Sequence, residues 1–97
     1  MNAQQLVAWN LRRLRVARRL AQEALAVDAE VDRTYVSRLE RELENPTVNV
    51  LERLAAALKV EIVEFFAVPE PGAEKPPPLR SGRRPGKRKK AVSGTGG

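Results

Sequence analysis

The chain has 97 residues, with 18 Lys and Arg against 12 Asp and Glu, and it contains no cysteine and no histidine. This length fits one small domain with a tail and excludes a second large domain. Without Cys and His there is no disulfide framework, and the common zinc sites and the usual base of a catalytic triad are missing. A hydrolase or a zinc finger is therefore a poor interpretation, and we expect no metal and no cofactor.

The longest uninterrupted apolar stretch, residues 54–58, is far shorter than the roughly 20 residues that a membrane span requires. Residues 1–10 carry no basic residue ahead of an apolar run and no small-residue cleavage site, which argues against a secretory signal. We therefore expect a cytoplasmic protein that makes no use of a membrane.

Charged and apolar residues divide the chain at about residue 68. Residues 1–68 hold ten basic and ten acidic residues, whereas residues 69–97 hold eight basic and two acidic ones, all six glycines and six of the seven prolines. The second composition cannot bury enough apolar surface to offset the entropy lost on ordering. We predict a folded domain at 1–68 and a disordered basic tail at 69–97, whose cations suit phosphate groups.

Residues 1–68 lack glycine and are rich in Leu, Ala, Arg and Glu, so an all-α domain is expected. Val7, Leu11 and Leu14 form the apolar stripe of an amphipathic helix over about residues 3–18. A short second helix follows at about 22–29, with its apolar residues turned inward.

Asp32 is a good N-cap for a third helix at about 33–41, because its carboxylate accepts the free backbone N–H groups of the first turn. The pair Asn45-Pro46 disfavours helix, and Thr47 is a good N-cap for a fourth helix at 48–58. A last helical turn at 62–66 completes a compact domain of five helices.

Two short helices joined by a short turn, the second opened by a cap, have the geometry of a DNA-reading helix-turn-helix. Over about residues 6–66 the chain closely resembles the phage repressor and Cro type (Xre-type, lambda repressor-like) of helix-turn-helix. Four motifs in the right order and spacing carry the resemblance: Gln22-Glu23-Ala24-Leu25-Ala26, residues 31–41 (VDRTYVSRLER), Asn45-Pro46-Thr47, and residues 54–60 (LAAALKV).

The chain departs from that family at the ends of its helices, where members usually have glycine. It has Arg19, Glu30, Glu42 and Lys59 there, which are less suited to a left-handed turn. The turns are then either longer than usual or held in strained geometry by a packed core. Ala21 also replaces the usual Ser before the second helix, which removes an N-cap worth on the order of 1 kcal/mol.

The resemblance implies which residues meet DNA, because it places the first residues of the third helix in the major groove. There an Arg binds guanine with two donors and a Thr meets the thymine methyl group. The implied base-reading residues are Arg33, Thr34, Ser37 and Arg38, with Ser37 the weakest candidate, and the implied phosphate contacts are Gln22, Tyr35 and Asn45. The alternative for the two arginines is that they are ordinary solvated charges.

The resemblance also implies an ion pair between Arg15 and Glu40, which would align the reading helix with the first helix. This pair is interpreted as structural.

The first helix has a second apolar face that DNA reading does not explain. At about 100° per residue, Trp9 and Val16 lie opposite the core stripe, with Leu6 near their edge. Phe65 and Phe66 raise the same question, because so short a helix cannot easily bury both rings and one of them belongs to the core. All five are candidate interface residues for a second subunit, a partner protein or the chain's own terminus, with partial burial of Trp9 against the N-terminal residues as the alternative.

These observations and the resemblance predict a nucleoid-associated transcription regulator, not an enzyme, that binds an inverted-repeat operator in double-stranded DNA as a homodimer and represses by occupying it. The alternative is an antitoxin-like or anti-activator module that presents Trp9 or the edge at Phe65 and Phe66 to a protein partner. A third interpretation, a protein that coats DNA without sequence preference, is supported by the basic tail alone. In that tail, residues 81–87 are only weakly similar to a minor-groove hook, and the remaining interpretations are non-specific nucleic-acid attraction or a solubilising tail.

Overall fold

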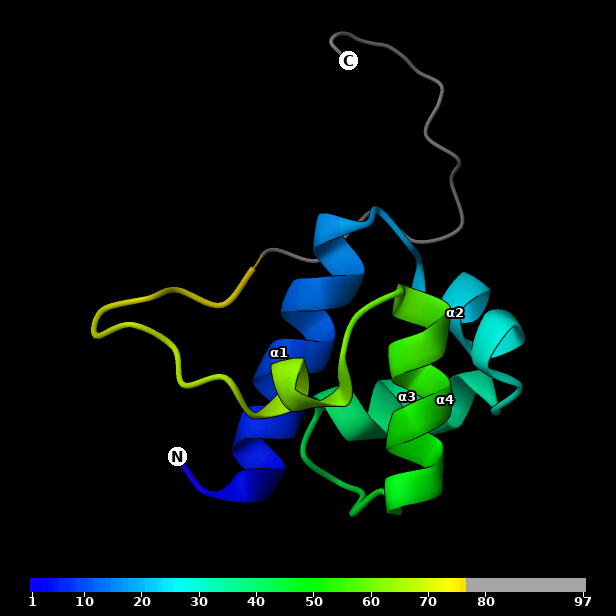
Figure 1. The fold of residues 1–97 in the computed structure, drawn as a ribbon, viewed down its shortest axis with the longest axis horizontal. Coiled ribbons are helices and arrows are strands. Elements are labelled where there is room, and N and C mark those ends of the chain that lie inside the picture. Colours follow the sequence, from blue (N-terminus) through cyan, green and yellow to red (C-terminus); the bar gives the residue numbers. More distant parts are fainter. Residues whose placement is uncertain (77–97) are drawn as a thin grey trace, which may run out of the picture.

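Four α-helices and one short 3-10 helix follow one another in the computed structural model, which describes residues 1–76 (Figure 1). The elements are α1 Ala3–Ala17, α2 Gln22–Ala29, α3 Arg33–Glu40, α4 Val48–Leu58 and η1 Ile62–Phe66. The predicted ranges agree with these bounds to within one residue. Residues 1–76 contain no strand, and none of their helices is long and apolar enough to cross a membrane.

The expected fifth helix is a 3-10 helix of five residues and not an α-helix. Glu61 precedes it without a side-chain cap, and the N–H of Glu64 donates to the carbonyl of Glu61 at 3.0 Å. So short a segment gains few α-helical hydrogen bonds and adopts the tighter pattern typical of short helical pieces. The all-α architecture holds within residues 1–76, with four α-helices instead of five.

Polar side chains begin three of the four α-helices in the described part of the chain. Asn2 and Gln5 exchange two hydrogen bonds, of 2.8 and 2.9 Å, in a capping box at the start of α1. The carboxylate of Asp32 accepts the N–H two residues on at 3.0 Å, and the hydroxyl of Thr47 accepts the N–H three residues on at 3.1 Å, so both predicted N-caps are confirmed. Ala21 leaves α2 without a side-chain cap.

Each α-helix is followed by a left-handed residue that is not glycine. These residues, with their φ angles, are Arg19 (56°), Glu30 (59°), Glu42 (64°) and Lys59 (59°). In every case the next residue is apolar, and its N–H donates to the carbonyl five positions back at 2.9 to 3.1 Å, as in a Schellman motif. The turns are therefore closed by this hydrogen bond in strained geometry, which decides between the two possibilities raised by the missing glycines.

The core lies where α1, α3 and η1 meet α2 and α4. Three of the apolar residues that close the Schellman turns, Leu20, Val31 and Val60, pack against it. Its fully buried side chains include Leu11, Leu25, Val36, Leu39, Leu54, Leu58 and Phe65. Val36 and Leu39 of α3 belong to this core while Arg33 and Thr34 are exposed, so one side of α3 is open to solvent.

Asn10 is a buried polar residue of α1 that holds η1 in place. Its Nδ2 lies 2.9 Å from the carbonyl oxygen of Phe65 and 2.8 Å from that of Ala67, and it also donates to the carbonyl of Leu6 at 3.0 Å. A buried amide without partners would cost free energy, so these bonds specify where η1 lies on α1 (Figure 1).

Residues 67–76 leave η1, swing outward and return to α1 without forming a helix or strand (Figure 1). The N–H of Ala73 donates to the carbonyl of Glu70 at 2.9 Å in a turn where Gly72 has a φ of 83°. Arg12 Nε then donates to the carbonyl of Pro76 at 2.9 Å. The first part of the predicted tail thus contacts α1, and the predictions for residues 77–97 lie outside the described residues.

Candidate nucleic-acid interface

α2 and α3 pack against each other and are joined by only three residues, 30–32. Glu30 turns the chain in left-handed conformation, and Asp32 caps the next helix. Two short helices joined in this way have helix-turn-helix geometry, in which the second helix enters the major groove. α3 is therefore the candidate reading helix.

The candidate base-reading residues share one side of α3. The opposite side, around Val36, is buried in the core. Arg33 and Thr34 lie in the first turn and are exposed, while Ser37 and Arg38 lie one turn further on and are half-buried. The spacing of four residues puts the two pairs on the same side of the helix. All four predicted residues are thus brought together on one surface.

Arg38 is already engaged within the protein. Its Nε donates to Glu44 Oε2 at 2.7 Å, and its Nη2 donates to the carbonyl of Leu43 at 3.2 Å. Both acceptors belong to the loop that follows α3. Arg33, in contrast, stands exposed at the first position of the helix.

The predicted ion pair between α1 and α3 is present. Arg15 Nε and Nη2 donate to the two carboxylate oxygens of Glu40 at 2.6 and 3.0 Å, and the side chains are only 4% and 3% exposed. Arg15 Nη1 also donates to the carbonyl of Leu20 at 2.7 Å. Gln22 Nε2 donates to Glu40 Oε1 at 3.2 Å, so the cluster joins α1, α2 and α3.

The three predicted phosphate contacts differ in their surroundings. The side-chain amide of Gln22 donates a hydrogen bond to Glu40, whereas Asn45 is exposed in the loop after α3. Tyr35 is half-buried against the core, and this burial raises the pKa of its phenol above the ordinary 10.0. The carboxylate of Glu44 raises that pKa further, and Arg53 acts in the opposite direction. The phenol is therefore a neutral hydrogen-bond donor at neutral pH.

The predicted interface residues do not form one exposed surface. Phe65 is completely buried, which contradicts its assignment to an interface and makes it the core member of the Phe pair. Phe66 is 41% exposed, whereas Leu6, Trp9 and Val16 are half-buried.

Trp9 lines a cavity of about 440 Å³ between α1 and residues 67–76, together with Asn10, Arg13 and Glu64. Arg13 Nη2 lies 3.4 Å from Glu64 Oε1 at its edge. The segment after η1 therefore lies beside Trp9, on the far side of this cavity from α1. Of the possibilities named from the sequence, this arrangement agrees with the chain's own terminus and not with the N-terminal residues.

Sequence reasoning missed two polar residues of this region, Asn10 and Glu44. Asn10 lies within the apolar pattern of α1, and a single polar residue at a buried helix position is the signal that could have identified it. Glu44 lies six residues after Arg38, in a loop with no period to follow. Nothing in the local sequence singles out Glu44 from the neighbouring Glu42.

The helix-turn-helix family HTH_3 matches residues 11–65, which include all of α2, α3 and α4. The chain belongs to this family. The matched region is therefore the helix-turn-helix of a DNA-binding transcription regulator.

Two relatives carry names of the same class. A hypothetical transcription factor of Neisseria meningitidis is 38% identical over 65 residues, which cover 67% of this chain and 61% of that protein. An uncharacterized HTH-type transcriptional regulator of Sinorhizobium fredii is 42% identical over 65 residues, which cover 67% of this chain and 84% of that protein. The chain thus spans less than two-thirds of the length of the Neisseria relative.

Solved structures share the helical arrangement. The crystal structure of the hypothetical transcription factor NHTF from Neisseria matches with a TM-score of 0.68 and 37% identity, covering 70% of this chain and 78% of that chain. The restriction-modification controller protein C.AhdI from Aeromonas hydrophila matches with a TM-score of 0.63 and 38% identity, covering 65% and 96%. The wild-type controller C.Esp1396I matches with a TM-score of 0.63 and 33% identity, covering 68% and 86%.

Proposed function

We propose that this HTH_3 protein binds a specific inverted-repeat operator as a homodimer and represses transcription by occupying it. The observation that carries the proposal is the open side of α3, where exposed Arg33 and Thr34 stand at the start of a capped reading helix. An Arg offers two donors to guanine, and a Thr methyl group suits thymine. Ser37 and Arg38 extend this surface by one turn.

The variants of the similar controller protein C.Esp1396I support this choice of residues. Structures of C.Esp1396I exist for variants in which three consecutive residues, an arginine, a threonine and a tyrosine, are replaced in turn. This chain contains the same three residue types in the same order once, at Arg33-Thr34-Tyr35. We assign base reading to the first two and a phosphate contact to the Tyr35 phenol, which is a neutral donor.

Phosphate contacts would fix the register of the protein on DNA. The start of α2 has no side-chain cap, so its first backbone N–H groups suit a phosphate oxygen. The side-chain amide of Gln22 donates one hydrogen bond to Glu40, and its remaining N–H can bind a phosphate oxygen. The exposed side chain of Asn45 offers a further phosphate contact.

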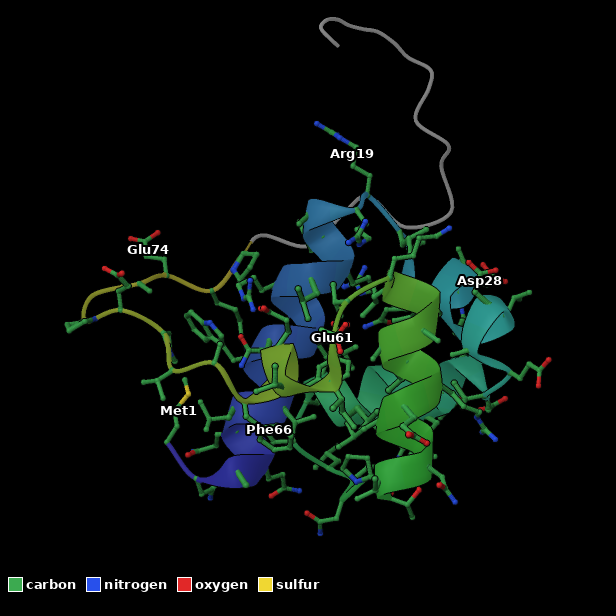
Figure 2. All side chains as sticks on the ribbon, viewed as in Figure 1. Met1, Arg19, Asp28, Glu61, Phe66 and Glu74 are labelled. Atoms are coloured by element: carbon green, nitrogen blue, oxygen red, sulfur yellow. The ribbon has the colours of Figure 1, made fainter. Side chains whose placement is uncertain are left out.

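The test compares a duplex selected from a random library by the wild-type protein with a scrambled duplex of the same composition. Arg33→Ala should weaken binding to the selected duplex by about 1 to 3 kcal/mol and change binding to the scrambled duplex much less. Arg19→Asn is the matched control, because Arg19 points away from α3 (Figure 2) and Asn tolerates its positive φ. An equal loss on both duplexes would make Arg33 a phosphate contact, and Gln22→Ala should behave in that way.

The homodimer is proposed from exposed apolar side chains outside the reading face. Phe66 is 41% exposed and Val63 is 65% exposed, and both belong to η1. A second copy packed there would put the half-sites about 10 base pairs apart or a multiple of that spacing. Phe66→Ala should weaken association in sedimentation experiments, and a wild-type protein that binds the selected duplex as one monomer would contradict the dimer.

The cavity beside Trp9 favours one alternative, a module that also binds a partner protein. Its walls combine an aromatic ring with the opposite charges of Arg13 and Glu64, which suits a peptide side chain. Trp9→Ala separates the two functions. Loss of regulation with unchanged DNA binding would favour the partner-binding module over simple occupation of the operator.

A further inference from the structure

Glu44 joins the loop after α3 to the reading helix. Its carboxylate accepts from Arg38 Nε at 2.7 Å, and the neighbouring carbonyl of Leu43 accepts from Arg38 Nη2 at 3.2 Å. Glu44 is itself held from the other side, because Gln4 Nε2 of α1 donates to its backbone carbonyl at 3.0 Å. The carboxylate therefore has a defined position next to one of the candidate base-reading arginines.

We propose that Glu44 is a specificity-determining residue, which orients the Arg38 guanidinium toward a base and keeps it from binding phosphates indiscriminately. This inference rests on the proposed function, since it requires Arg38 to meet DNA. Glu44 itself acts through Arg38 and is a positioning residue.

The hydrogen-bond donors of Arg38 are sufficient for both tasks. A guanidinium carries five N–H donors. Glu44 occupies the single donor on Nε and Leu43 occupies one on Nη2, which leaves one on Nη2 and both on Nη1. A guanine needs two of these at its O6 and N7 atoms. The contact with Glu44 therefore holds the guanidinium by one edge and leaves the other edge free.

The charge of Glu44 acts on DNA of any sequence. A carboxylate oxygen 2.7 Å from Nε largely cancels the attraction of Arg38 for phosphates. Attraction to phosphates supplies most of a protein's affinity for random DNA. The two side chains are 42% and 32% exposed, and an exposed pair of this kind contributes little to stability. Replacing Glu44 should therefore change DNA binding more than it changes folding.

The experiment compares Glu44→Ala with Glu42→Ala on the selected and scrambled duplexes described above. Glu42 is an exposed acid of the same loop, so both variants remove one negative charge, but only Glu44 contacts Arg38. Glu42→Ala should raise affinity for both duplexes by the same factor. Glu44→Ala should raise affinity for the scrambled duplex but not for the selected one, so that the ratio of the two affinities falls about 5- to 10-fold, within the range of one good base contact.

A double-mutant cycle tests whether the effect passes through Arg38. In the Arg38→Ala background, Glu44→Ala should leave the affinity ratio unchanged. A further fall in that background, or equal ratios for Glu44→Ala and Glu42→Ala, would overturn the inference alone, with thermal unfolding as the check that all variants fold. If the wild-type protein enriches no sequence from the library, the proposed function fails and this inference fails with it.

Discussion

At the scale of single residues, the ion pair of Arg15 and Glu40 and the ion pair of Arg38 and Glu44 join the same chemical groups in different surroundings. The first pair is 4% and 3% exposed and the second 42% and 32%. Removing one partner of a buried pair leaves an uncompensated charge, whereas water solvates the survivor of an exposed pair. Burial, and not the length of the hydrogen bond, decides what each pair contributes.

We expect Glu40→Gln to lower the free energy of unfolding by about 3 to 5 kcal/mol, because Arg15 would be left charged and buried. Glu44→Gln, the matched change in the exposed pair, should lower it by at most about 1 kcal/mol. Denaturant unfolding followed by circular dichroism measures both. Similar losses for the two variants would mean that the buried pair is well solvated in solution.

Tyr35 is the only tyrosine of the chain, so its titration can be followed directly by the ultraviolet absorbance of tyrosinate. In the folded protein, burial raises the pKa of the Tyr35 phenol above 10.0, and Glu44 adds a smaller effect in the same direction. Tyr35 therefore keeps its proton to a higher pH in the folded state than in the unfolded state. The free energy of unfolding is unaffected by this group below pH 10.0 and falls as the pH rises through the pKa of Tyr35 in the folded state. A midpoint at or below the unfolded value would contradict this, and Glu44→Gln should lower the midpoint.

At the scale of elements, the ends of the four α-helices within residues 1–76 combine a strained residue with a favourable motif. A left-handed residue other than glycine costs roughly 1 to 2 kcal/mol. The long Schellman hydrogen bond and the apolar residue after it are nevertheless retained at every one of these ends. The helix bounds were predictable even without glycine, because apolar periodicity and the N-caps Asp32 and Thr47 marked where the helices run.

Glycine at such a position should therefore stabilise the protein. We expect Glu30→Gly and Lys59→Gly each to raise the free energy of unfolding by about 0.5 to 1 kcal/mol, which is the relieved strain less the extra chain entropy that glycine loses. Ala24→Gly, in the exposed interior of α2, is the control and should lower it by about 1 kcal/mol. Destabilisation at Glu30 as large as at Ala24 would argue that the turn is not left-handed.

At the scale of the whole molecule, charge is distributed unevenly along the chain. Residues 1–41, which contain α3, carry eight basic and five acidic residues, whereas residues 42–68 carry two and five. A net charge of +3 on the part that holds the reading helix and −3 on the rest would orient the domain on DNA. Residues 77–97 add seven basic residues and no acidic one.

Truncation after Pro76 keeps the contact with Arg12 and removes those seven cations. Each phosphate that they neutralise contributes about 0.9 to the slope of log K against log salt. We expect the truncated protein to bind selected and scrambled duplexes more weakly by similar factors and with a flatter salt dependence, as measured by fluorescence anisotropy. An unchanged slope would mean that the segment does not touch DNA, and a loss of discrimination would mean that it reads the minor groove.

Local signals along the chain predicted the four α-helices and the N-caps Asp32 and Thr47. The side of α3 that carries Arg33 and Thr34 was predicted through the resemblance. Helix periodicity, capping and turn signals act over a few neighbouring residues, so they can be read along the chain. The ion pair of Arg15 and Glu40 was predictable only through the resemblance, because 25 residues separate its members.

Three features could be seen only in the packed molecule: which of two adjacent phenylalanines is core, that η1 is a 3-10 helix, and that the segment after η1 lies beside Trp9. It also brought Asn10 to the carbonyl of Phe65, 55 residues away, and set Glu44 against Arg38. These outcomes depend on how the helices pack and where loops without a repeating pattern run. Burial and distance, which only packing defines, then determine whether a polar side chain is a structural tie or is free to meet DNA.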